Sequence, residues 1–79
     1  MTEDIKPNET LDCRGLSCPM PILKTKKAVD ALQTGQVLKM VATDPGSLPD
    51  VQAWAAKTGH ELLEHESEGG TFTFYIKKK

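Results

Sequence analysis

The chain has 79 residues, 38% of them hydrophobic, and a formal net charge of −1 at neutral pH. A chain this short folds as one domain with one small core, which excludes a deep substrate cavity, and its balanced charge argues against a nucleic-acid-binding face. It has no signal-peptide pattern and no apolar run as long as a membrane span, so we expect a cytoplasmic protein, which we also expect to be a monomer. Because so small a domain has no deep cavity, we expect its chemistry to take place at the surface, with other proteins as partners.

The N-terminal region predicts a flexible tail followed by a short strand. Residues 1–8 are polar and are expected to be flexible, whereas residues 9–79 are expected to form the single domain. Residues 10–13 alternate between polar and apolar side chains, which is typical of an edge strand, and Gly15 has a structural role in ending it.

A helix is predicted between Pro19 and Gly35, because proline favours the start of a helix and glycine its end. Its inner face is expected to carry residues at a 3.6-residue spacing: Ile22, Thr25, Ala28, Val29 and Leu32. Residues 36–43 are rich in apolar and β-branched side chains and predict a central strand.

The second half predicts another helix and two further strands. Ser47 is expected to cap the helix, with Asp50 completing a capping box, and Trp54 to lie on its inner face. Residues 60–66 and 71–76 predict two strands joined by a turn at two glycines. The order β-α-β-α-β-β predicts an α+β fold: a two-layer sandwich in which two helices pack on a four-stranded mixed sheet.

The two cysteines, Cys13 and Cys18, are too few for a disulfide framework. Zinc needs four ligands, and only His60 and His65 remain, in another part of the chain, so we expect no metal site and no cofactor. Thiol chemistry and inert burial remain as alternatives for the cysteines.

Cys18 has the features expected of a reactive thiol. If Pro19 is the first helical residue, Cys18 is the N-cap, and the helix dipole favours its thiolate. Cysteines at helix N-termini can have pKa values lowered from about 8.5 to roughly 3.5–7.5. Pro19 and Pro21 make the segment rigid and lack an N–H group, which leaves Met20 N–H as the main donor to the sulfur. The alternative is a small, inert capping residue.

Residues 11–23 contain Leu-Asp, a Gly-Leu pair and Cys-Pro-Met-Pro. This string resembles the signature of the TusA (SirA-like) sulfur-carrier family. The resemblance implies a cytoplasmic sulfurtransferase in which Cys18 accepts persulfide sulfur from a cysteine desulfurase or rhodanese and passes it to an acceptor protein. The family serves tRNA thiolation, molybdenum-cofactor synthesis or sulfur oxidation, and residues 42–47 resemble members from sulfur-oxidising organisms.

Two residues close to Cys18 each allow two interpretations. Cys13 is expected to be a buried strand residue, with a resolving thiol as the alternative. Asp44 is expected to shape the turn before Pro45. Alternatively, if the first and second strands are parallel, Asp44 lies at the same end of the sheet as Cys18, where its carboxylate could raise the pKa of the thiol or contact a partner protein.

The exposed side of the first helix is expected to carry a docking patch for partner proteins. Met20 and Leu23 fall on the solvent side of this helix, where the core does not need apolar residues. Lys24 and Lys27 lie beside them and could steer acidic surfaces.

Two other functions remain alternatives. Small α/β sandwiches also serve as regulatory or nucleic-acid-binding modules, but Phe72 and Phe74 share one strand face and are expected in the core rather than stacked on bases. A thiol-disulfide redox protein could use Cys13 and Cys18, although their spacing is not Cys-x-x-Cys.

Overall fold

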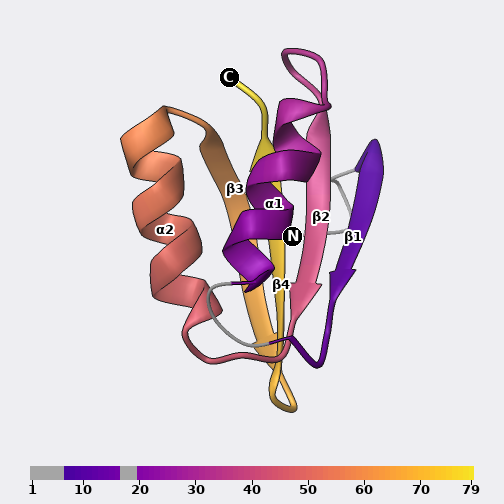
Figure 1. Cartoon of the computed structure of the whole chain (residues 1–79), viewed down its shortest axis with the longest axis vertical. Helices are drawn as coiled ribbons and strands as arrows, with labels where there is room; N and C mark the ends of the chain where they lie inside the picture. The colour runs from indigo at the N-terminus through magenta and orange to yellow at the C-terminus, as the bar shows by residue number, and fades with distance from the viewer. Residues whose placement is uncertain (1–6, 17–19) are drawn as a thin grey trace.

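The computed structural model describes residues 7–16 and 20–79 of the chain. The elements follow one another as predicted from the sequence (Figure 1): β1 (Glu9–Cys13), α1 (Met20–Asp30), β2 (Val37–Ala42), α2 (Ser47–Thr58), β3 (Glu61–Glu68) and β4 (Thr71–Lys77). The predicted β-α-β-α-β-β order is therefore confirmed.

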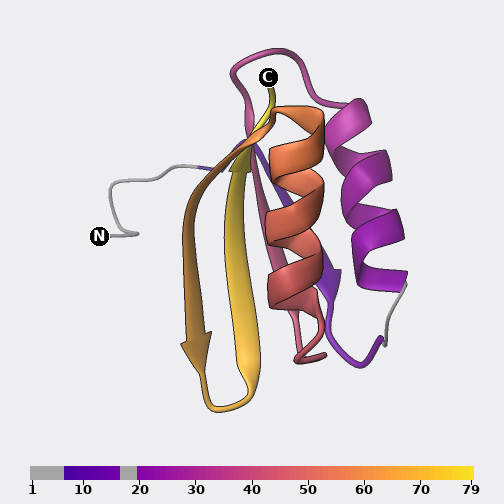
Figure 2. The ribbon, with the colours of Figure 1, turned by 90° about the vertical axis from the view of Figure 1, so that its left-hand side faces the viewer.

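The four strands form one mixed sheet in the order β1-β2-β4-β3. β1 runs parallel to β2, while β4 is antiparallel to both of its neighbours, β2 and β3. Both helices cover the same face of the sheet and leave its other face without a helix (Figure 2). This is the predicted two-layer α+β sandwich. Within the described residues, neither helix has the length and apolar character needed to cross a membrane.

The core lies between this sheet and the helices. Alternate residues of the central strands point towards the helices, as the two-residue period of a strand requires. The inward residues of β2 pair with those of β4 across the sheet: Leu38 with Ile76, Met40 with Phe74, and Ala42 with Phe72. Phe74 is fully buried and Phe72 packs against the same cluster, so the expectation that both belong to the core is confirmed.

The inner face of α1 is the predicted one. Thr25 and Val29 are fully buried, and Ile22 and Ala28 pack against the core. Burying the hydroxyl of Thr25 is tolerated because it donates a hydrogen bond of 2.7 Å to the carbonyl of Pro21, one turn earlier. Pro21, which we expected to be structural, is itself buried in the first turn.

The end of α1 comes earlier than Gly35 predicted. The helix ends at Asp30, and Leu32 N–H donates to the carbonyl of Val29, a tighter bond than the helical one. Lys78 Nζ then donates to the carbonyls of Asp30 and Leu32 at 3.1 and 2.7 Å. A lysine from the far end of the chain thus satisfies carbonyls that a longer helix would have bonded internally.

The predicted cap of α2 is wrong. Ser47 is the first residue of the helix, Gly46 occupies the N-cap position, and no side chain of the described residues makes the capping hydrogen bond. The turn before the helix explains the difference, because Ser47 N–H already donates to the carbonyl of Asp44 at 2.9 Å. Packing buries Ser47, and its hydroxyl has no hydrogen-bond partner among residues 7–16 and 20–79.

His60 does not belong to the strand that was predicted for residues 60–66. It precedes β3, is half-buried, and packs against Trp54 with ring centroids 5.2 Å apart. Its Nδ1 accepts a hydrogen bond of 3.0 Å from the backbone N–H of Lys79. His65 is exposed on β3, as expected.

Candidate functional site

One end of the molecule brings together the features predicted around Cys18. β1 and β2 are parallel, and their last residues, Cys13 and Ala42, pair with each other. Figure 1 shows that both strands end, and both helices begin, at this lower end. Cys18 itself lies outside the described residues, together with Ser17 and Pro19. The described chain leads into this segment at Leu16 and leaves it at Met20.

The loop after β1 has a defined shape. Leu16 N–H donates to the carbonyl of Cys13 at 3.2 Å, which closes a tight turn. Gly15 has φ +81°, a conformation that residues with a Cβ adopt only with strain, which explains the structural role predicted for it. Its N–H donates to Thr43 Oγ1 at 2.9 Å, so the loop is bonded to the residue that follows β2.

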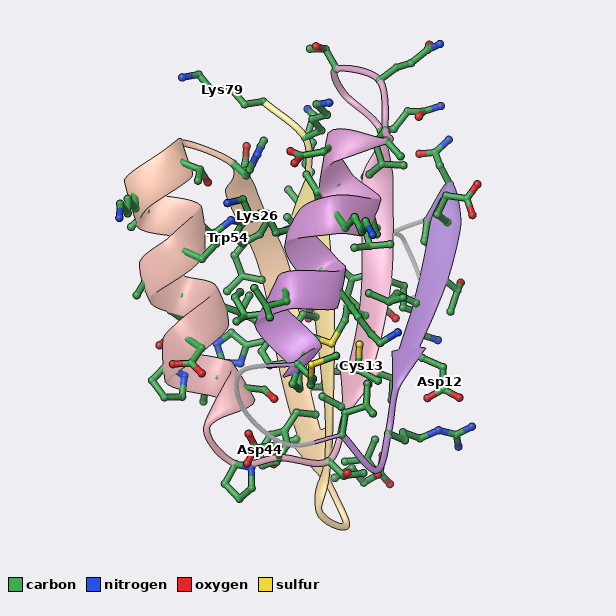
Figure 3. The ribbon with its side chains drawn as sticks, in the orientation of Figure 1. Asp12, Cys13, Lys26, Asp44, Trp54 and Lys79 are labelled. Atoms are coloured by element: carbon green, nitrogen blue, oxygen red, sulfur yellow. The ribbon has the colours of Figure 1, made fainter. Side chains whose placement is uncertain are left out.

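Asp12 and Arg14 form an exposed ion pair at the start of this loop. Two guanidinium nitrogens of Arg14 donate to the two carboxylate oxygens of Asp12 at 2.9 Å, and the backbone N–H of Arg14 donates to one of them at 3.0 Å. The side-chain and backbone hydrogen bonds from Arg14 lower the pKa of Asp12 to about 2. Asp12 projects from the outer side of β1 (Figure 3). Both side chains of the pair are exposed, and an exposed pair of this kind contributes little to stability.

Cys13 is the buried strand residue that the sequence predicted. Its side chain is fully buried in the core between β1 and the helix layer (Figure 3). Burial raises the pKa of its thiol, which the nearby charge of Lys24 opposes in part. The thiol form therefore dominates at neutral pH, and a protonated, buried sulfur is a poor nucleophile.

Asp44 shapes the connection between β2 and α2, as predicted. It is half-buried, its Oδ1 accepts a hydrogen bond of 3.4 Å from Gly46 N–H, and its backbone carbonyl accepts one from Ser47. Figure 3 places it at the same end of the molecule as the first turn of each helix. The expectation that Asp44 lies at the sheet edge to which the β1–α1 loop leads is therefore confirmed.

The side chains predicted to be exposed on α1 are exposed, while their role in docking partner proteins stays a prediction. Met20 and Leu23 are 43% and 52% exposed, and they are the exposed large hydrophobic side chains of the described residues. Lys24 and Lys27 are exposed on the same face, because residues three and four apart in a helix are neighbours. We call these four residues the α1 patch.

Thr43 was missed by the sequence analysis, which treated it only as the last residue of a strand. The sequence signal for this contact is weak. It consists of a small hydroxyl residue directly after β2, the strand that runs parallel to β1. Its hydrogen bond joins residues 28 positions apart, and neither composition nor periodicity identifies such a contact.

Comparison with known proteins agrees with this geometry. The family model described as Sulfurtransferase TusA matches residues 9–78. The sulfur carrier protein TusA of Allochromatium vinosum is 54% identical over 71 residues, which cover 90% of this chain and 93% of that protein. The sulfur carrier protein TusA of Pseudomonas entomophila is 42% identical over 76 residues, or 96% and 95% of the two chains.

The fold is similar to a solved structure as well. The crystal structure of the SirA-like protein from Desulfitobacterium hafniense matches with a TM-score of 0.75 and 27% identity, covering 87% of this chain and 95% of that one. The match to the family extends over nearly all of the chain and includes residues 11–23, which carried the resemblance. The chain belongs to the TusA family of sulfur carriers.

Proposed function

We propose that this protein carries sulfur as a persulfide on Cys18, accepting it from a donor protein and passing it to an acceptor protein. The observation that carries the proposal is the position of the Cys18 segment in the chain. It joins the loop after β1 to the first turn of α1, at the end of the molecule where both helices begin.

Persulfide transfer needs no further reactant. The Cys18 thiolate attacks the outer sulfur of a persulfide on the donor, a new S–S bond forms, and the donor cysteine leaves as a thiolate. The second transfer repeats the exchange, with the acceptor's thiolate as the attacking group and Cys18 as the leaving group. Sulfur and electrons balance in each step, so the protein needs only a thiolate that partner proteins can reach.

The local charges favour such a thiolate. Met20, only two residues after Cys18, begins a helix of 11 residues, whose N-terminal end carries a partial positive charge. Lys24 adds a full positive charge one turn later. The carboxylate of Asp44 at the same end opposes both, which keeps the sulfur basic enough to attack a disulfide-like bond.

Partner proteins would dock on the α1 patch and at Asp44. Exposed apolar side chains beside basic ones form a surface that can bury area against an acidic partner. Met20 would lie at the centre of the contact because it is closest in sequence to Cys18, while Lys24 and Lys27 would guide the approach.

Reversing the charge of Lys27 tests this docking surface. Lys27→Glu is expected to slow sulfur transfer from a cysteine desulfurase about three- to tenfold at low salt, because steering acts on the association rate. The difference should shrink at high salt, where charges are screened. Lys57→Glu is the matched control, since Lys57 lies in the last turn of α2 as Lys27 does in α1. Equal rates for both variants would argue against the α1 patch.

Cys13 is proposed to be structural rather than a resolving thiol. Cys13→Ala is expected to leave the persulfide lifetime on Cys18 unchanged, measured by mass spectrometry over time. Alanine is the better substitute because the hydroxyl of serine would be buried at this site, which costs about 1–3 kcal/mol if it finds no partner. A longer persulfide lifetime in this variant would instead show that Cys13 displaces the sulfur.

The loading experiment tests the function itself. The protein is incubated with a cysteine desulfurase and cysteine, or with a rhodanese and thiosulfate, and its intact mass is measured. We expect a species heavier by one sulfur atom that dithiothreitol converts back to the starting mass. The proposal would be contradicted if neither donor system formed this species.

A further inference from the structure

We infer that the groove between β1 and α1 binds an extended, acidic segment of a partner protein, which adds a strand to this edge of the sheet. The inference rests on the proposed function, because the partner is a protein that exchanges sulfur with this chain. We call this hollow the β1–α1 groove. Its apolar lining residues are Leu11, Ala28, Ala31, Leu32 and Leu38.

The β1–α1 groove exists because small side chains face the sheet at the end of α1. Ala28 lies in the last turn of the helix, and Ala31 follows its last residue. An alanine side chain is a single methyl group, so the two alanines leave a hollow of about 280 Å³ beside Leu11 and Leu38. An aliphatic or aromatic side chain of a partner suits a mostly apolar hollow of this kind.

β1 provides a strand edge beside this groove. In the sheet order β1-β2-β4-β3 it pairs with β2, and the described part of the chain places no strand on its other side (Figure 1). The outward N–H and C=O groups of an edge strand can pair with another chain. An edge strand next to an apolar pocket is how several domains bind extended peptides, since main-chain hydrogen bonds give affinity and the pocket selects a side chain.

The charges of α1 favour an acidic segment. Lys27 lies one turn before Ala31, and Lys24 lies about one turn further back, so both lysines continue the stripe of α1 that faces the groove. Burial raises the pKa of the Cys13 thiol and the charge of Lys24 opposes this, so Lys24 acts on the last residue of β1. Because alternate residues of a strand share a face, the segment would place an apolar side chain in the groove and an acidic one, two residues along, near the lysines.

The two edges of the sheet differ in charge. β3, the other edge strand, contains four glutamates and no lysine or arginine, so it disfavours an acidic segment. On β1, the carboxylate of Asp12 is paired with Arg14, and Glu9 lies at the opposite end of the strand from Cys13. An acidic segment is therefore directed to β1 rather than to β3.

Peptide selection tests this inference without any sulfur chemistry. Short random peptides that contain no cysteine are displayed and selected on the protein, with dithiothreitol present. We expect the selected peptides to carry an aspartate or glutamate two residues from a large apolar side chain. When such a peptide binds the isotope-labelled protein, it should shift the NMR signals of residues 9–13 and slow the hydrogen exchange of their amides.

Matched variants test the groove and its charges by fluorescence anisotropy of a selected peptide. Ala31→Glu is expected to weaken binding about tenfold or more, because the bound apolar side chain would bury the new carboxylate. Ala56→Glu, at an exposed alanine of α2, is the control and should bind as the unmodified protein does. Lys24→Glu should weaken binding about three- to tenfold at low salt, whereas Lys57→Glu on α2 should not.

The inference is overturned if no peptide is selected, if the selected peptides lack acidic residues, or if Ala31→Glu and Ala56→Glu bind equally well. It is also overturned if the protein self-associates in sedimentation experiments and Ala31→Glu prevents this, because the occupant would then be a second copy of the chain. These measurements include no sulfur donor, so they can fail while Cys18 still accepts sulfur. The proposed function fails only if no sulfur adduct forms.

Discussion

Cys18→Ser is expected to abolish the sulfur adduct completely and, with it, any transfer to an acceptor protein. A serine hydroxyl cannot form a persulfide. Cys13, the remaining cysteine of the sequence, is not expected to replace Cys18, because it is buried and this burial raises the pKa of its thiol. The measurement is intact mass after incubation with a cysteine desulfurase and cysteine.

Cys13→Ala is the matched control for this result. It removes the other sulfur and should form the adduct in the same yield as the unmodified protein. The melting temperature of both variants shows whether either has unfolded. An adduct of undiminished yield on Cys18→Ser would show that Cys18 is not the carrier residue.

Phe74→Ala is expected to have the largest effect on stability. Phe74 is fully buried on β4, which lies between β2 and β3 in the sheet, and pairs with Met40 of β2. Replacing a buried phenylalanine with alanine costs about 3–5 kcal/mol through lost burial and the cavity that remains. A domain of this length has a total stability of roughly 4–12 kcal/mol, so the variant should be largely unfolded or close to it. Urea denaturation followed by circular dichroism measures the loss.

Phe72→Ala provides the comparison for this prediction. Phe72 lies on the same face of β4 but is only half-buried, so its truncation should cost clearly less. A smaller loss of unfolding free energy for Phe74→Ala than for Phe72→Ala would contradict the description of the core.

The inward faces of the elements could be predicted because local periodicity determines them. Thr25 and Val29 follow the 3.6-residue period of a helix, and Phe72 and Phe74 follow the two-residue period of a strand. Side chains at such spacing share one face whatever the rest of the chain does. The element order and the α+β class followed from the same patterns.

The end of α1 and the start of α2 could not be predicted from residue types alone. α1 ends at Asp30 where Lys78 supplies donors to its last carbonyls, and the two residues are 48 positions apart. Ser47 looked like a cap from its residue type, but the turn at Asp44 already bonds its N–H, and the helix begins one residue earlier than a Ser47 cap would allow. The contact of Lys78 with α1 leaves no pattern in the local sequence of the helix.

The candidate site was predicted in part. Gly15 and Asp44 were recognised because turns have characteristic residue types, and Cys13 because cysteine is among the residue types most often buried. Thr43 was not recognised, since its contact with Gly15 exists only when two loops meet at one edge of the sheet. The sequence therefore predicted the residues with local roles and missed the one whose role depends on tertiary structure.

The most direct test of the central claim locates the sulfur on the chain. The protein is loaded by a cysteine desulfurase from cysteine that carries a radioactive sulfur label and is then alkylated and digested with trypsin. We expect the label on the peptide of residues 15–24, which contains Cys18, and its loss from that peptide after treatment with dithiothreitol before alkylation. Label on the peptide of residues 1–14, which contains Cys13, or no label on either, would contradict the assignment of Cys18 as the sulfur-carrying residue.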